Sequence, residues 1–185
     1  MKTINILILF LIIFFVILQC TLIDTIKILD IKPDMLLILI VLLALHFGPL
    51  RSLYAGILAG IFIETTSAIP RGIAVTSYAL GGLILGYMRK WIYPALFYSL
   101  CANFKNSFSR PPLKQRLLSE ISITFVFSLI VYILLYFLLQ ICNIRDCSFF
   151  HAFICVILPA SLYTALVSPI VFSFIITVLE VCKIT

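Results

Sequence analysis

The strongest constraint on this chain is a series of six long apolar runs separated by short polar breaks. The runs cover about residues 4–23, 34–47, 50–66, 73–88, 117–142 and 149–181. A bilayer core about 30 Å thick needs a helix of about 20 apolar residues. Only 11% of the residues are charged and 64% are hydrophobic, whereas soluble domains have about 25% and 45–50%. The pattern therefore predicts an all-α integral membrane protein, a bundle of six transmembrane helices forming one domain over 1–185.

The second apolar run is short for a crossing, and its ends carry start and stop signals. About 14 residues rise roughly 21 Å as an α-helix, against a hydrocarbon core of about 30 Å. Pro33 and Asp34 suit the first turn of a helix, and Gly48-Pro49 ends one helix and begins the next. The second and third runs therefore form either two crossings or a re-entrant hairpin. Asp34 either complements the helix dipole or faces a partner or substrate.

The first and the last apolar runs each predict a single membrane crossing. The N-terminal run follows Lys2 as in a signal sequence, but no A-x-A cleavage site comes after it, so we expect an uncleaved first helix. The last run, 149–181, has too few residues for two spans of about 20 each. We expect one long tilted helix with a kink near Pro159 or Pro169.

Basic residues concentrate in one segment, 89–116, between the fourth and fifth runs. The segment holds six lysines and arginines, and no acid occurs between Glu64 and Glu120. We expect a basic cytoplasmic loop with an interfacial helical segment over its aromatic part, 91–104. Along six crossings, nine of the 13 basic residues fall on the side of the two termini. The positive-inside rule then places both termini in the cytoplasm.

Small and polar residues at four-residue intervals mark one face on each of two neighbouring runs. These faces consist of Ser52, Gly56, Gly60 and Glu64 in the third run and of Tyr78, Gly82 and Gly86 in the fourth. Such spacing lets two membrane helices approach closely. We therefore expect the third and fourth helices to pack against each other through these residues.

Glu64 is the acidic residue with the strongest functional signal, because a carboxylate within a membrane segment is costly and usually serves a purpose. The structural alternative is that it pairs with Arg71 or forms hydrogen bonds within 65–67. We expect Glu120 and Glu180, near the inner membrane boundaries, to be ordinary solvated helix ends.

The sequence contains none of the common catalytic or metal-binding patterns. It has no P-loop, no Rossmann glycine pattern, no HExxH and no nucleophile elbow with a matched base. Its six cysteines form no CxxC pair, and two histidines complete no usual zinc set. We therefore expect a protein that is not an enzyme and that holds no cofactor or metal. A disulfide between Cys142 and Cys147, on either side of an extracytoplasmic loop, stays open.

Several motifs in residues 31–88 together resemble one family. They are Ile31-Lys-Pro-Asp-Met-Leu-Leu-Ile-Leu-Ile40, Gly48-Pro-Leu, Gly56-Ile-Leu-Ala-Gly-Ile-Phe-Ile-Glu64, Gly72 and Tyr78-Ala-Leu-Gly-Gly-Leu-Ile-Leu-Gly86. The chain resembles the rod shape-determining protein MreD family, which has a Pro-Asp opening of its second helix and glycine-rich third and fourth helices. That family usually has Asp where this chain has Glu64. The second half of the chain resembles the family in hydropathy alone.

The resemblance implies a non-enzymatic scaffold in the bacterial inner membrane that supports lateral peptidoglycan synthesis in the cell-elongation complex. Such proteins associate with MreC and, through the complex, with MreB, RodA and a class B penicillin-binding transpeptidase, and not with nucleic acid. The family is similar in fold to the substrate-binding subunits of energy-coupling-factor transporters, so the alternative is a vitamin-type transporter subunit. For the scaffold we expect polar partner contacts from Asp34, Glu64 and Arg71, and contacts of 89–116 with cytoplasmic partners or anionic lipid.

Overall fold

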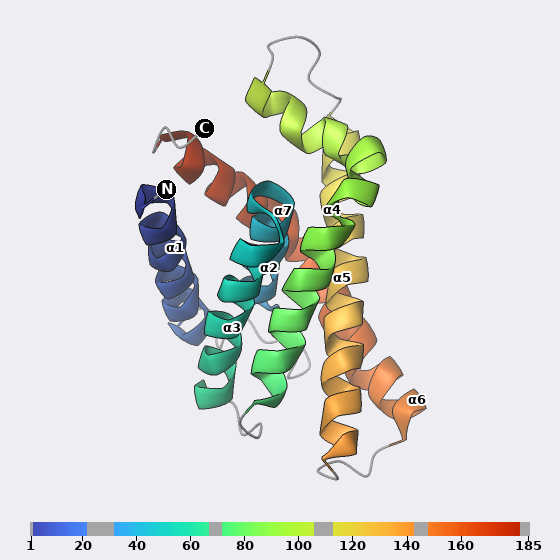
Figure 1. The fold of residues 1–185 in the computed structure, drawn as a ribbon. Helices are drawn as coiled ribbons and strands as arrows, with labels where there is room; N and C mark the ends of the chain where they lie inside the picture. The colour runs from blue at the N-terminus through green and yellow to red at the C-terminus, as the bar shows by residue number, and fades with distance from the viewer. Residues whose placement is uncertain (1, 22–31, 67–71, 106–112, 143–147, 182–185) are drawn as a thin grey trace.

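The fold is that of a computed structural model, which describes residues 2–21, 32–66, 72–105, 113–142 and 148–181. Within these ranges the chain is all-α and forms six helical rods (Figure 1). They are α1 (Lys2–Thr21), α2 (Met35–Phe47), α3 (Pro49–Thr66), α4 (Ile73–Lys105), α5 (Leu113–Ile141) and a last rod made of α6 (Phe149–Ala152), the π-helical turn η1 (Phe153–Ile157) and α7 (Leu158–Val181).

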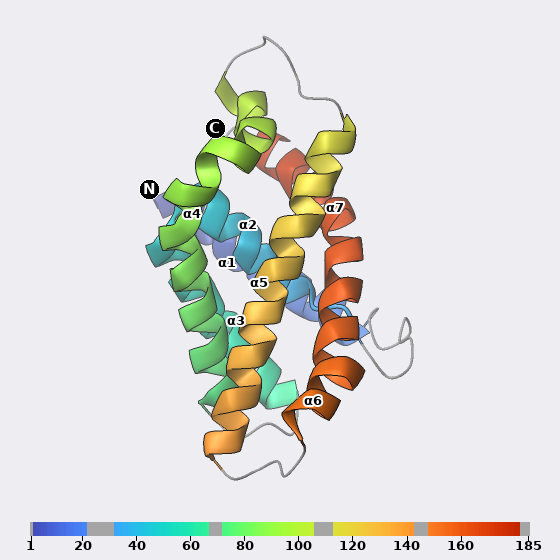
Figure 2. The ribbon, with the colours of Figure 1, turned by 90° about the vertical axis from the view of Figure 1, so that its right-hand side faces the viewer.

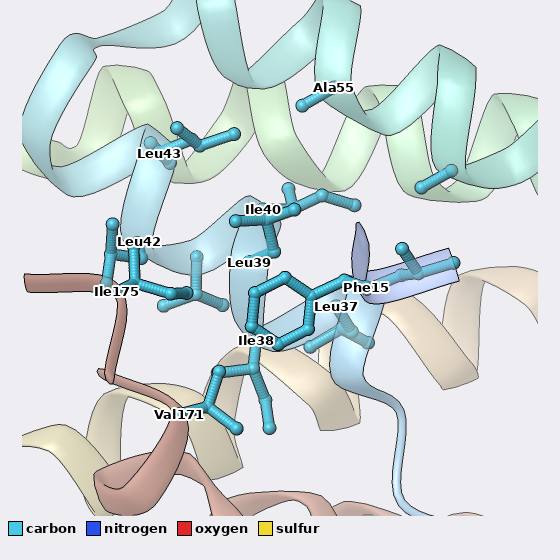
Figure 3. Packing of buried hydrophobic residues seen from close by; sticks show 14 of the residues in the cluster. Phe15, Leu37, Ile38, Leu39, Ile40, Leu42, Leu43, Ala55, Val171 and Ile175 are labelled. Atoms are coloured by element: carbon cyan, nitrogen blue, oxygen red, sulfur yellow. The ribbon is translucent and has the colours of Figure 1, made fainter. Parts of the chain in front are cut away.

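The shortest of these rods, α2, forms the centre of the bundle. It contacts α1, α3, α4, α5 and α7, and every residue from 36 to 45 is at most 1% exposed. Figure 3 shows its side chains between Phe15 of α1, Ala55 of α3 and Val171 of α7. A helix that is apolar on all sides belongs in a core or in lipid, and here the other helices cover it.

Asp34, Gly48 and Pro49 mark the ends of α2 as expected, whereas Pro33 precedes the N-cap residue and does not lie in the first turn. Asp34 is the N-cap residue, and its side chain accepts a hydrogen bond from the Leu37 N–H. At the other end Gly48 has a φ of 90°, a left-handed conformation that favours glycine. Pro49 then opens α3, where a proline costs no hydrogen bond.

Close contact between α3 and α4 depends on glycine. A Cβ atom added at Gly56 would lie 2.5 Å from the Tyr78 carbonyl oxygen, and one at Gly60 would lie 2.4 Å from the Val75 Cα. From α4, a Cβ at Gly86 would lie 2.4 Å from the Pro49 Cα. The neighbouring atoms are backbone in each case, so no side-chain movement would relieve the overlap. The structure thus brings these residues together at the helix contact that their spacing predicts.

A fourth glycine and a serine complete this contact. A Cβ at Gly82 would lie 2.8 Å from the Ser52 carbonyl oxygen. In return the Ser52 hydroxyl, which is fully buried, donates a hydrogen bond of 2.8 Å to the Gly82 carbonyl. Small residues and an interhelical hydrogen bond are the two features that hold membrane helices together.

The predicted end of the fourth helix at residue 88 is wrong. The helix α4 continues to Lys105, so the helical segment expected over 91–104 is joined to it without a break, and α5 begins at Leu113 rather than at 117. Figures 1 and 2 show the last part of α4 bending away from its first part. Pro94 lies in this part, and a proline inside a helix removes a hydrogen bond and bends the axis. The basic residues there ended the hydrophobic pattern but not the helix.

The last rod departs from α-helical geometry before Pro159. The π-helical turn η1 covers Phe153–Ile157, and the Leu158 N–H donates to the Phe153 carbonyl, five residues back. Pro159 has no N–H to donate, and its ring would clash with the carbonyl four residues back. A widened turn relieves that clash. Pro169 lies inside α7, which continues past it without interruption.

Two of the described helical stretches, Glu120–Ile141 and Phe149–Val178, are long and apolar enough to cross a membrane. Two shorter apolar helices, Ile8–Thr21 and Met35–Phe47, accompany them. Successive rods run in opposite directions, so the start of α1, the end of α4 and the end of α7 lie at the same end of the bundle (Figures 1 and 2).

Candidate functional site

The most concentrated polar site in the described part of the chain surrounds Asp34, at the start of the central helix. Asp34 is only 6% exposed. One carboxylate oxygen accepts from the Leu37 N–H at 3.0 Å. The other accepts from the hydroxyl of Tyr78, on α4. Both oxygens of this buried carboxylate therefore have donors from the protein.

Side chains from two further helices accept hydrogen bonds from backbone N–H groups at the start of α2. The Asp34 N–H donates to the Thr164 hydroxyl of α7 at 3.1 Å. The Met35 N–H donates to the side-chain oxygen of Gln19, on α1, at 3.0 Å. The Gln19 side-chain nitrogen donates in turn to the Pro33 carbonyl at 3.4 Å. The first N–H groups of a helix have no partners within the helix, and in this buried position other helices supply them.

Tyr132 of α5 is the last member of this site and lies beside the Thr164 side chain. The Thr164 hydroxyl also donates to the Ala160 carbonyl of its own helix at 2.8 Å. We call the five side chains the Asp34 cluster: Gln19, Asp34, Tyr78, Tyr132 and Thr164.

The chemistry of the Asp34 cluster favours a fixed arrangement of helices. A buried carboxylate is stabilised by the positive end of a helix dipole and by hydrogen bonds to its oxygens, and Asp34 has both. The hydrogen bonds join α2 to α1, α4 and α7 at one level. With both oxygens engaged by protein groups, the carboxylate cross-links the bundle. Its burial does not fit the predicted role of Asp34 as a contact for a partner protein.

Glu64 binds the beginning of α4. One of its carboxylate oxygens accepts from the Gly72 N–H at 2.8 Å, and the other accepts from the Val75 N–H at 2.9 Å. This is a capping interaction made by the preceding helix, and the helix dipole adds to its favourable energy. Neither of the roles that the sequence suggested for Glu64 included hydrogen bonds from the Gly72 and Val75 N–H groups. Arg71, like residues 67–70, lies outside the described residues.

The sequence reasoning missed several buried polar residues. Glu120 is 2% exposed, so the expectation that it is a solvated helix end is wrong. Gln19, Tyr132 and Thr164 were not singled out, although α5 carried a usable signal. Its polar residues recur at every fourth position: Glu120, Thr124, Ser128, Tyr132 and Tyr136. A polar stripe along an apolar helix indicates its inward face.

Among the described residues, no group of three or more His, Cys, Asp or Glu could hold a metal ion. Cys142 has a free thiol, and Cys147 and Glu180 lie outside the described side chains. Compared with known proteins, the chain matches no family, no curated protein and no solved structure.

Proposed function

We propose that this chain is a non-enzymatic scaffold in the bacterial inner membrane that acts in the cell-elongation complex through association with MreC. MreB, RodA and a class B penicillin-binding transpeptidase would be its indirect partners. The proposal takes the chain as a six-pass membrane protein with both termini in the cytoplasm, similar in fold to the substrate-binding subunits of energy-coupling-factor transporters. Two membrane-length helices, the further apolar rods and the excess of basic residues on the side of the termini support this topology.

One observation carries the proposal: the residues behind the resemblance to the MreD family contact one another in the structure. Asp34 accepts from Tyr78, Glu64 caps α4, and the glycines of α3 and α4 lie against the opposite backbone. These positions build one rigid body from α2, α3 and α4. A solute-binding subunit would instead need polar groups directed at a ligand cavity. The arrangement therefore favours a structural role over transport.

The rigid body leaves an outward apolar face for partners or lipid. On α3 this face consists of large hydrophobic residues that are exposed in the isolated chain: Leu50, Tyr54, Leu58, Ile61 and Phe62. Buried Asp34 and engaged Glu64 would contribute by fixing this face in place. We assign the contact with a partner's transmembrane helix to this α3 face, which is one of several exposed apolar faces of the bundle.

The experiment that tests the proposal is affinity purification of a tagged copy from its native cells in mild detergent, with mass spectrometry of the proteins recovered. Recovery of MreC, MreB and peptidoglycan synthases is the expected result. A Tyr54→Ala, Leu58→Ala variant on the α3 face should lose these partners, whereas Leu162→Ala, on the exposed face of α7, should keep them. Recovery of ATPase subunits with a transmembrane coupling protein would overturn the scaffold in favour of a transporter subunit.

A further inference from the structure

The last rod changes phase where the turn η1 interrupts it. From Ile157 onward its buried residues follow α-helical spacing: Ile157, Ala160, Ser161, Thr164, Ala165 and Ser168. Counting back from Ile157 at about 3.6 residues per turn, an unbroken helix would bring Phe153 and then Phe150 to the side of α5. The structure has Ala152 buried there instead, while Phe150 is 71% exposed.

The offset is one residue and arises in η1. The Leu158 N–H donates to the Phe153 carbonyl, five residues back, whereas an α-helix bonds four residues back. One extra residue in a turn rotates the preceding segment by about 100° relative to α7. Phe149 thus takes the position on α5 that Phe150 would have. In the same way Ala152 takes the position of Phe153.

The contacts of this end of the rod with α5 are apolar and local. The Phe149 ring centroid lies 5.3 Å from that of Tyr136 and 5.7 Å from that of Phe137. Tyr136, Ala152 and Ile157 form a buried cluster of their own, apart from the main core around α2. Figures 1 and 2 show α6 beside the last turns of α5. This end can therefore change its register without repacking the core.

The unbroken register would also present apolar side chains to α5. Phe150 would replace Phe149, and Phe153 would replace Ala152. Neither exchange buries a polar group, so hydrophobic burial alone does not exclude this register. The difference is size, because a phenyl ring in place of the Ala152 methyl group would meet Tyr136, which is 3% exposed. The end of the rod would have to move away from α5.

Two prolines in the same rod show what sets the register. In an unbroken helix Pro159 would leave the Cys155 carbonyl without its donor, and the proline ring would clash with that carbonyl. At Pro169 the corresponding carbonyl, that of Ala165, accepts from the Ser168 hydroxyl at 2.7 Å, and the helix continues. The residue before Pro159 is a leucine, which has no hydroxyl to donate. The wider turn η1 accommodates this proline instead.

We propose that η1 is a register joint: Pro159 holds Phe149 and Ala152 against α5, and without it the rod takes the unbroken register and its N-terminal end moves off α5. The joint decides which of two adjacent aromatic rings, Phe149 or Phe150, packs on α5 and which one the bundle presents at its surface. The inference rests on packing contacts, and it depends neither on the membrane placement nor on the scaffold role.

Cross-linking of cysteine pairs reads the register directly. In the full chain, with its six native cysteines replaced by serine, Tyr136→Cys is combined with Phe149→Cys or with Phe150→Cys. A short thiosulfonate cross-linker joins thiols that lie close together. Trypsin cuts after Arg145, between the two positions, so a link appears as two joined fragments. With Pro159 present, the pair at 136 and 149 should link more than the pair at 136 and 150.

Three variants test the role of the proline. Pro159→Ala should reverse the order, so that the pair at 136 and 150 links more. Pro169→Ala is the matched control and should keep the original order, because α7 is regular at that position. Deletion of Ile154 together with Pro159→Ala removes the extra residue, so an unbroken helix carries Phe149 back to α5 and the original order returns. Circular dichroism measures the helix content of each variant.

Four results would overturn the inference. A stronger link between 136 and 150 with Pro159 present would contradict the register itself. An unchanged order in Pro159→Ala would mean that the proline does not hold the register. A reversed order that the deletion of Ile154 fails to restore would mean that the movement is not a shift of one residue. Loss of helix content in Pro159→Ala would contradict the unbroken helix expected there.

Discussion

Removing the hydroxyl of Tyr78 should destabilise the bundle by about the free energy of one hydrogen bond to a buried charge. Tyr78→Phe keeps the ring, which is 3% exposed, and deletes only the group that donates to Asp34. The carboxylate keeps the Leu37 N–H and the dipole of α2, so it loses one of its two hydrogen-bond donors. Hydrogen bonds to charged groups contribute about 1.5–3 kcal/mol. We expect the free energy of unfolding to fall by that amount.

The measurement is unfolding by sodium dodecyl sulfate in mixed micelles, followed by far-ultraviolet circular dichroism. Tyr87→Phe is the matched control, because Tyr87 lies on the same helix and is 66% exposed. Its effect should stay within about 0.5 kcal/mol. A double-mutant cycle of Tyr78→Phe with Asp34→Ala should show a coupling of about 1–3 kcal/mol. A Tyr78→Phe protein as stable as the Tyr87→Phe protein would refute the role assigned to the buried carboxylate.

Three further substitutions test the other contacts by the same unfolding assay. Thr164→Val removes the acceptor of the Asp34 N–H and should cost about 1–3 kcal/mol, whereas Thr164→Ser should restore most of the stability. Glu64→Ala removes the cap of α4 and should cost about 0.5–2 kcal/mol; an unchanged midpoint would show that the cap contributes nothing. Gly60→Ala forces a methyl group against the Val75 backbone and should cost about 1–3 kcal/mol. Leu58→Phe, on the outer face of the same helix, should be neutral, and equal losses would contradict the glycine contact.

Most of the features that could be predicted from the sequence depend on patterns of neighbouring residues. Six apolar runs predicted six helical rods because each run is long enough to satisfy its own backbone as a helix. Pro33-Asp34 and Gly48-Pro49 marked the ends of α2 because capping and left-handed turns depend on a few adjacent residues. The four-residue spacing of the glycines predicted the α3–α4 contact because that spacing defines one helix face.

The sequence could not reveal which helix lies at the centre. The helices of this bundle are apolar both toward the core and on the outside, so the amphipathic contrast that usually orients a helix is missing. Both α1 and α2 are strongly apolar, yet Phe10 of α1 is exposed while Leu39 of α2 is buried. Only the packing of the rods decided that difference.

Tertiary structure also decided what the polar residues do. Asp34 and Thr164 are 130 positions apart in the chain, and Asp34 and Tyr78 are 44 apart, so no local pattern connects them. Their types and positions were visible in the sequence, but their hydrogen bonds depend on three rods meeting at one level. The sequence alone therefore determined the rods, the ends of α2 and one pairwise contact. The sequence left open whether Asp34 complements the helix dipole or faces a partner or substrate. The folded bundle made it a buried cross-link, because a carboxylate enclosed by helices is stable only with donors from its neighbours.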